Sequence, residues 1–86
     1  MSFKLSIIDP NGKLYEDTVD SVAVTGTQGA FEVYSGHMPI IASLKAGLAR
    51  VRRQGHEIPF EITGGILEVD LKHNVTLLAD QATAVK

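Results

Sequence analysis

The sequence contains no cysteine, and only 6% of its 86 residues are aromatic. Without cysteine the chain has neither a disulfide framework nor a zinc–thiolate site. Small secreted domains usually depend on such links, so their absence favours a reducing, intracellular compartment. No apolar run approaches the ~18 residues of a membrane span, and the first residues lack the apolar core of a signal peptide. Any association with a membrane is therefore expected to go through a partner.

An excess of basic charge is also absent, because the formal net charge is −2. This balance argues against a protein that binds nucleic acid. One basic group nevertheless stands out within nine positions: Lys45, Arg50, Arg52 and Arg53. It is either a solvated strand face, which is the ordinary role of such a group, or a docking edge for an acidic protein partner.

The composition is that of a single globular domain spanning residues 1–86, with 44% apolar and 21% charged residues. A chain of this length buries only about 60% of its unfolded surface, so the core is expected to be thin. No repeat, linker or low-complexity segment divides it.

Apolar residues alternate with polar ones at a period of two, and no segment keeps the helical period of 3.6. The alternating sets are Phe3, Leu5 and Ile7; Val22 and Val24; Phe31 and Val33; Ala49 and Val51; and Ile58, Phe60 and Ile62. Turn signals at residues 9–12 and 72–74 separate such runs. The pattern predicts an all-β antiparallel sandwich of eight to ten short strands, in which Pro59 suits an edge strand.

No residues are predicted to be catalytic, to bind a cofactor or to hold a metal. The three histidines, His37, His56 and His73, lie in or beside turns without metal-ligand spacing. Ser35 lies two residues from His37 but lacks the flanking glycines of a nucleophile elbow, so a small hydrolase is the weakest alternative. The Gly64-Gly65 pair precedes no helical pattern and is interpreted as a place where the backbone turns or another chain comes close, rather than a phosphate loop.

The segment Gly36-His37-Met38-Pro39 forms a glycine- and proline-bounded corner before an apolar pair. It is either a structural turn or a shaped contact surface, in which Met38 supplies adaptable apolar area and His37 forms a hydrogen bond with a partner.

Five motifs occur in the order and spacing of one known family: residues 26–29, 34–39, 44–47, 64–69 and 74–79. Over residues 3–82 the chain resembles the N-terminal domain of the epsilon subunit of F-type ATP synthases. The resemblance implies a flattened sandwich of about ten antiparallel strands, with no catalytic activity and no cofactor. It also implies a place in the rotor's central stalk, where the domain binds the gamma subunit and the ring of membrane-embedded c subunits and couples proton-driven rotation to ATP synthesis.

The resemblance assigns site residues by position. Residues on the gamma side are His37, Met38, Pro39 and Ala42, and residues on the c-ring side are Gln28, Gly29, Ala30, Phe31 and Glu32. The family often has an acidic residue at the position of Ala30, so an ion pair to the ring is either missing here or moved to Glu32. It also often has glycine at the position of Glu32 and proline at that of Ser35.

Most members of the family continue into a helical hairpin that can inhibit ATP hydrolysis. Because this chain stops at Lys86, we expect neither hairpin-type inhibition nor an ATP site. The expected location is the cytoplasmic face of the bacterial plasma membrane, because no transit peptide precedes Phe3. The alternative is a free-standing β-sandwich module that binds a different protein partner.

Overall fold

The computed structural model describes residues 1–85, and all of the regular structure there is β-strand. The strands are β1 (Phe3–Asp9), β2 (Gly12–Val19), β3 (Ser21–Gly26), β4 (Gly29–Tyr34), β5 (Ile40–Leu44), β6 (Gly47–Arg53), β7 (His56–Ile62), β8 (Gly65–Val69), β9 (Val75–Ala79) and β10 (Ala82–Ala84). The all-β prediction is confirmed, and so is the expected number of strands.

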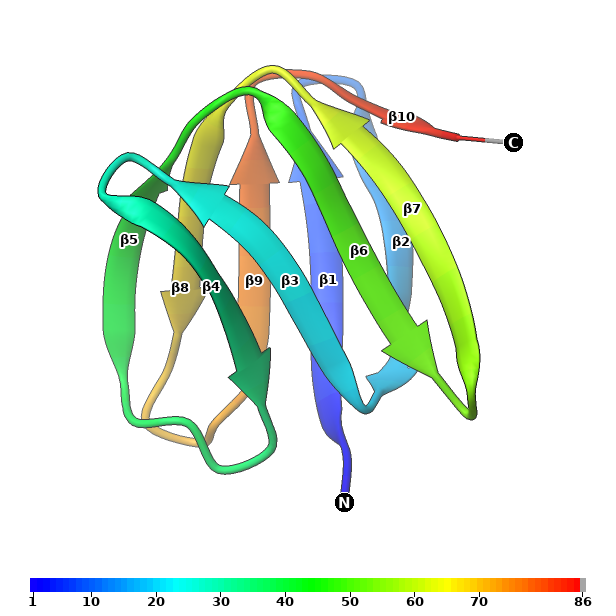
Figure 1. Cartoon of the computed structure of the whole chain (residues 1–86), viewed down its shortest axis with the longest axis vertical. Helices are drawn as coiled ribbons and strands as arrows, with labels where there is room; N and C mark the ends of the chain where they lie inside the picture. Colours follow the sequence, from blue (N-terminus) through cyan, green and yellow to red (C-terminus); the bar gives the residue numbers. More distant parts are fainter. Residues whose placement is uncertain (86) are drawn as a thin grey trace.

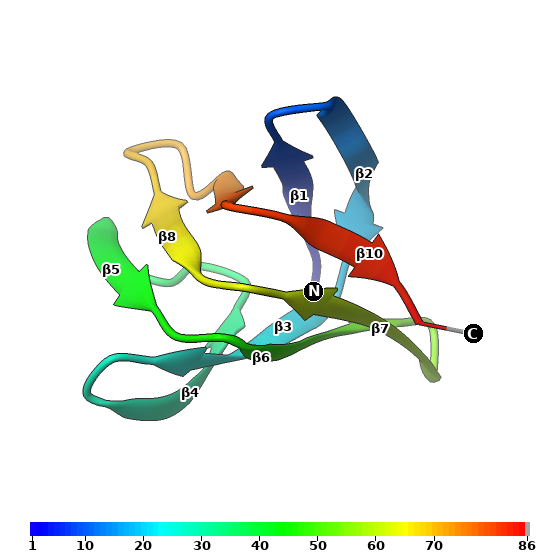
Figure 2. The ribbon, with the colours of Figure 1, turned by 90° about the horizontal axis from the view of Figure 1, so that it is seen from above.

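The strands form one folded sheet in the order β10-β7-β6-β3-β5-β8-β9-β1-β2, with β4 paired to β3 beside this path. Seen from above, the sheet makes two layers: β4, β3, β6 and β7 lie on one side, and β5, β8 and β1 on the other (Figure 2). The two layers are joined at one corner by a single residue pair, Gly26 with Leu44. The principal dimensions are 28 × 26 × 23 Å.

One strand pair departs from the predicted antiparallel arrangement. β1 runs parallel to β9, with Leu5 opposite Val75 and Ile7 opposite Leu77, and both strands point upward in Figure 1. Parallel neighbours require a long connection rather than a hairpin. Here almost the whole chain makes that connection, since β1 is the first strand and β9 the last but one.

The core lies between the two layers and is built from the inward-facing residues of each strand. Alternation along a strand sends successive side chains to opposite faces, so every second residue is buried. The buried apolar residues are Phe3, Leu5, Ile7, Val19, Val22, Val24, Val33, Leu44, Ala49, Val51, Phe60, Ile62, Leu67, Val69, Val75, Leu77 and Ala79. Every alternating set predicted above supplies core residues, apart from the half-buried Phe31 and Ile58 at its margin.

Pro59 shows why a strand next to the edge tolerates proline. β7 is not itself an edge strand, because β10 covers it from Phe60 to Ile62. The carbonyl of Pro59 accepts a hydrogen bond from the Val85 amide, so the proline nitrogen also faces the β10 side, beyond the last paired residue of β10. Proline therefore removes only the reciprocal hydrogen bond to the Val85 carbonyl, at the very end of the pairing between β7 and β10.

The turns match the residues that form them. The β1–β2 hairpin closes at Asp9 and Gly12, with the Asp9 side chain accepting a hydrogen bond from the Asn11 amide at 2.9 Å. Gly65, at φ +148°, is where the backbones of β8 and β9 come close, since a Cβ atom there would overlap the Leu78 carbonyl. Of the two interpretations of the glycine pair, the close approach of another part of the chain is confirmed at Gly65.

Candidate functional site

The β3–β4 hairpin carries the residues that the sequence assigned to the c-ring side. It is a two-residue turn closed by the pair Gly26 and Gly29, and Gly29 adopts φ +129°. Gln28, Gly29 and Ala30 are exposed at its tip, whereas Phe31 is half-buried against the core. The tip is therefore a small, mostly polar projection at the upper left of the molecule in Figure 1.

Glu32 belongs to the exposed face of β4 rather than to the tip. Its carboxylate accepts a hydrogen bond from the Tyr34 hydroxyl at 2.7 Å and another from the buried Ser21 hydroxyl at 2.9 Å. These hydrogen bonds hold the pKa of Glu32 below its ordinary value, and the same contact raises the pKa of Tyr34. The carboxylate is thus already hydrogen-bonded within the chain.

Removing the tyrosine hydroxyl tests this network. In the wild-type chain we expect the Glu32 carboxyl to titrate below the ordinary glutamate range, and in Tyr34→Phe we expect its pKa to rise toward that range. Because folding lowers the pKa of Glu32, its carboxylate stabilises the folded chain fully above the unfolded-state pKa. This contribution is lost as the pH falls through the folded-state pKa. Carbon-detected NMR titration of the Glu32 side chain measures both values. Equal pKa values in the two proteins would contradict the network.

The β4–β5 loop (residues 35–39) carries most of the residues assigned to the gamma side. Gly36 adopts φ +79°, and the His37 ring nitrogen Nδ1 lies 2.7 Å from the carbonyl oxygen of Met38. The Ser35 hydroxyl donates a hydrogen bond to the Ser2 carbonyl at 3.2 Å, which ties the loop to the N-terminal segment. Met38, with 69% of its surface exposed, projects from this corner.

Ala42 lies apart from the other gamma-side residues. It is half-buried in the middle of β5, opposite Leu67 of β8. Together with Ile41 and Ser43 it lines one side of a hollow of about 510 Å³, whose other side is the β3–β4 hairpin. The structure therefore groups Ala42 with the hairpin and not with the loop.

The hairpin tip and the β4–β5 loop lie at opposite ends of β4 (Figure 1). β4 contains six residues, and at ~3.3 Å per residue it spans roughly 20 Å. The molecule is at most 28 Å long. The two candidate surfaces consequently lie at opposite ends of one strand, far apart relative to the size of the molecule.

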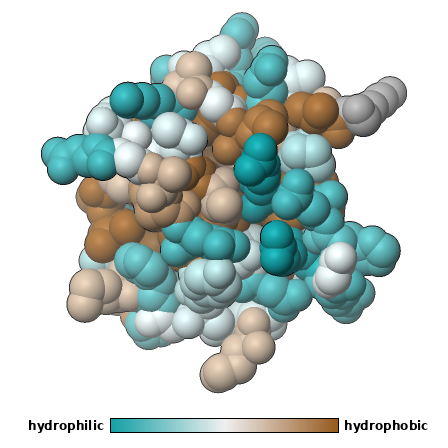
Figure 3. All heavy atoms as spheres, viewed as in Figure 1, coloured by the Kyte–Doolittle hydropathy of each residue, from teal (hydrophilic) through white to brown (hydrophobic). Residues whose placement is uncertain are grey.

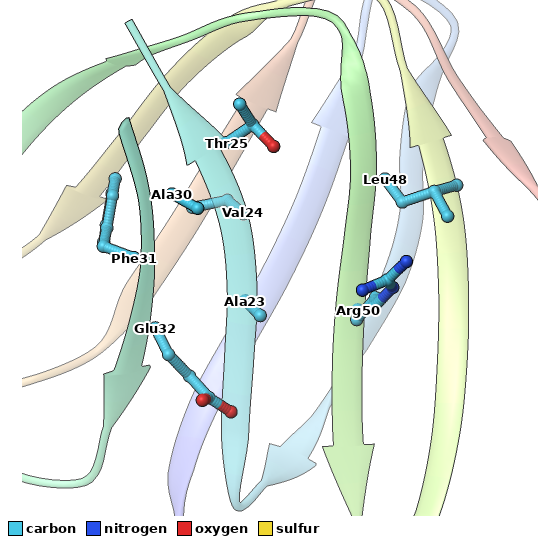
Figure 4. Close-up of a pocket in the computed structure, with 8 residues that line it drawn as sticks. All are labelled: Ala23, Val24, Thr25, Ala30, Phe31, Glu32, Leu48 and Arg50. Carbon is cyan, nitrogen blue, oxygen red and sulfur yellow. The ribbon is translucent and has the colours of Figure 1, made fainter. Parts of the chain in front are cut away.

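A second hollow, of about 420 Å³, lies on the outer face of β4, β3 and β6. Figure 4 shows Ala23, Val24 and Thr25 of β3 along its floor, with Glu32 on one side and Leu48 and Arg50 on the other. Arg50 and Arg52 are both exposed on this face, and Arg52 lies 3.8 Å from Glu57. Arg53 points to the opposite side of β6 and pairs with Asp17 at 3.1 Å, so the basic group is divided between two faces.

The described residues offer no arrangement for nucleophilic catalysis at Ser35. Its hydroxyl is directed to Ser2 and the His37 Nδ1 to Met38, so among residues 1–85 no hydrogen bond joins Ser35 to His37. Within the same range no group of three histidine or acidic side chains is placed to hold a metal ion. That part of the chain also contains no helix long and apolar enough to cross a membrane.

The fold and the arrangement of its loops define a small β-sandwich with two separate exposed corners. The sequence matches the family described as the β-sandwich domain of the ATP synthase delta/epsilon chain over residues 2–85. The chain belongs to this family.

Two solved structures have the same fold. A chain of the mitochondrial ATP synthase of Euglena gracilis, from a structure of its OSCP/F1/c-ring part, superposes with a TM-score of 0.90 at 19% identity. A chain of the central stalk and c-ring of the Tetrahymena thermophila mitochondrial ATP synthase superposes with a TM-score of 0.82 at 12% identity. Each match covers 96% of this chain, but only 53% and 66%, respectively, of the matched chains. The chain thus spans between half and two thirds of their length.

Proposed function

We propose that the chain is a non-catalytic subunit of the rotating central stalk of an F-type ATP synthase. In this role it docks a gamma subunit to the ring of c subunits and couples proton translocation to ATP synthesis. The observation that carries the proposal is the family match, which spans residues 2–85 of the 86 in the chain. The whole β-sandwich, and not a short motif, is therefore that of the family.

The placement of the two corners supports a docking role. A subunit that joins two partners needs two separate surfaces on a body that does not deform between them. Here the surfaces lie roughly 20 Å apart along β4, and β4 is paired along its full length to β3. β3 is in turn bonded to β5 and β6, so that force applied at one corner passes into both layers.

We assign the corners as the resemblance does. The gamma subunit contacts His37, Met38 and Pro39, and the c-ring contacts Gln28, Gly29 and Ala30 at the hairpin tip. Phe31 borders the hollow beside the hairpin and so lies next to the ring contact. Ala42 is the one exception to the resemblance, which assigns it to the gamma side: it borders the same hollow, and we place it next to the ring contact. Glu32 contributes to the ring side by holding β4 to β3 through its hydrogen bond with Ser21. The proposed location of the complex is peripheral, on the cytoplasmic face of the bacterial plasma membrane.

Two substitutions at opposite corners test the assignment. Met38→Asp places a charge in the gamma contact, and Ala30→Trp places a bulky side chain on the hairpin tip; both wild-type side chains are exposed, so the fold is preserved. We expect Met38→Asp to weaken binding to purified gamma subunit about tenfold, equivalent to ~1.4 kcal/mol, and to leave binding to detergent-solubilised c-ring unchanged. We expect the reverse for Ala30→Trp. Isothermal titration calorimetry measures both affinities.

Two results would contradict the proposal. If the folded wild-type chain binds neither gamma nor the c-ring, the free-standing binding module with another partner replaces the rotor subunit. If both variants weaken binding to the same partner, the two corners form one interface and the division between them is wrong.

A further inference from the structure

The large apolar side chains of highest exposure after Met1 are gathered at one corner of the molecule. Leu71 is 86% exposed, Ile41 75% and Met38 69%. Met38 lies in the β4–β5 loop and Ile41 near the start of β5, whereas Leu71 lies in the β8–β9 loop (residues 70–74), far from them in sequence. In Figure 3, apolar surface gathers along the left edge, over β4 and β5, and again at the upper right near β10, while the region of the β6–β7 turn is hydrophilic. A cluster of this kind on a small domain indicates an interaction surface.

An open groove of about 840 Å³ runs between the two segments. Residues 39–41 line one side, and residues 68–72 with Asn74 line the other. Its apolar lining includes Pro39, Ile41 and Leu71, and its charged lining is Glu68, Asp70 and Lys72. Within residues 1–85, neither Glu68 nor Lys72 forms an ion pair. The Asp70 carboxylate accepts hydrogen bonds from two backbone amides. The groove is therefore largely apolar, and Glu68 and Lys72 are the charged groups available to a partner.

The β8–β9 loop is held in shape by Asp70. The Asp70 carboxylate accepts hydrogen bonds from the amides of Lys72 at 2.8 Å and Asn74 at 2.9 Å. The Asp70 carbonyl accepts a third, from the amide of His73 at 3.0 Å. These contacts place His73 in the left-handed backbone region, at φ +65°, and leave Leu71 projecting into solvent.

His73 connects this loop to the β4–β5 loop. Its ring nitrogen Nδ1 lies 3.0 Å from the carbonyl oxygen of His37, which is 36 residues away. A carbonyl oxygen only accepts, so Nδ1 must carry the proton and donate. The two loops lie side by side at the lower left of Figure 1. This hydrogen bond ties together the two loops from which the walls of the groove continue.

We propose that the β8–β9 loop is the second half of the gamma-side contact: Leu71 inserts into the partner, an apolar ridge of the partner fills the groove, and His73 positions the loop. The inference rests on the proposed function, because the partner is the one assigned to His37 and Met38. The groove is continuous with that corner through Pro39 and Ile40. Its charges require a partner surface with a basic group facing Glu68 and an acidic group facing Lys72 around a central apolar side chain.

The direct test compares two exposed leucines. We expect Leu71→Asp to weaken binding to purified gamma subunit at least tenfold, and Leu14→Asp to change it less than twofold. Leu14 is 42% exposed on β2, which is the edge strand at the far end of the sheet order from β10. In the wild-type chain, methyl NMR with added gamma is expected to shift the Leu71 methyl signals and to leave those of Leu14 in place.

The positioning role of His73 is tested with two further variants. Glycine and asparagine both tolerate φ near +65°, but only asparagine has a side-chain donor. We expect His73→Gly to keep the unfolding midpoint close to that of the wild type and to weaken gamma binding three- to tenfold. We expect His73→Asn to recover part of that loss. If the affinities of His73→Gly and wild type are equal, the positioning role is wrong.

The outcomes separate this inference from the proposed function. If wild type binds gamma and Leu71→Asp binds equally well, the groove is not part of the contact although the rotor assignment stands. If wild type does not bind gamma, both fail together. If sedimentation shows that wild type dimerises and Leu71→Asp does not, while both bind gamma equally well, a second copy of the chain fills the groove. That result overturns the inference.

Discussion

Leu77→Ala is expected to lower the free energy of unfolding by about 2–5 kcal/mol. Leu77 is fully buried in the middle of β9, between β8, where Leu67 lies opposite, and β1, where Ile7 does. Truncation removes apolar surface from the core and leaves a cavity that two fixed backbones prevent from collapsing. Since the total free energy of unfolding of native proteins is only about 5–15 kcal/mol, this single change is expected to leave a marginally folded chain. Urea denaturation followed by circular dichroism measures the loss.

The neighbouring residue provides a matched control. Leu78 lies on the same strand but points outward and is 45% exposed. Leu78→Ala removes the same atoms from a side chain that remains in contact with water in the folded chain. We therefore expect it to lower the free energy of unfolding by less than ~1 kcal/mol. Similar losses for the two variants would mean that β9 is not placed as described.

Gly65→Ala is expected to destabilise the chain by about 3–5 kcal/mol, from the sum of backbone strain and steric overlap. At φ +148° Gly65 has a backbone conformation that other residues rarely adopt. The added methyl group would in addition overlap the Leu78 carbonyl and lie 2.9 Å from the Ala79 Cα atom. Backbone atoms of a paired strand cannot move aside without breaking the β8–β9 ladder, in which Gly65 is opposite Ala79.

Gly55→Ala isolates the strain from the overlap. Gly55, in the β6–β7 turn, also has a positive φ, +79°, but a Cβ there would meet nothing within 4 Å. Its replacement therefore costs only the conformational penalty of about 1–2 kcal/mol. Thermal unfolding of the two variants side by side measures the difference, and a Gly65→Ala protein as stable as Gly55→Ala would refute the close approach of β8 and β9.

The strands were predictable from the sequence because each is buried on one face, and this appears in the sequence as alternating apolar and polar residues. Phe3, Leu5 and Ile7 alternate with polar residues, and each is buried. Strand direction leaves no such trace, since a parallel and an antiparallel neighbour bury the same alternate residues. The β1–β9 pairing was therefore outside what alternation can reveal, and so was the position of β4 beside the main path.

The candidate site divides in the same way. The corner at His37 and Met38 was visible because glycine and proline mark it locally, and the hairpin tip because two glycines enclose it. The contact between His73 and His37 was not visible, because it joins two turns whose spacing of 36 residues carries no periodic signal. The hydrogen bond between Glu32 and the buried Ser21 was likewise not predicted. A serine among valines indicates only an alternating strand and gives no sign of a polar partner on the neighbouring strand.

The parallel pairing of β1 with β9 has a consequence for synthesis of the chain. β1 is made first, yet one of its two neighbours consists of residues 75–79, close to the end of the sequence. While the chain emerges from the ribosome, β1 and β2 form a hairpin whose inner edge has no partner until β9 follows. Long-range pairings of this kind fold slowly and leave a strand edge open to other chains. The domain therefore closes only after β9 has been made.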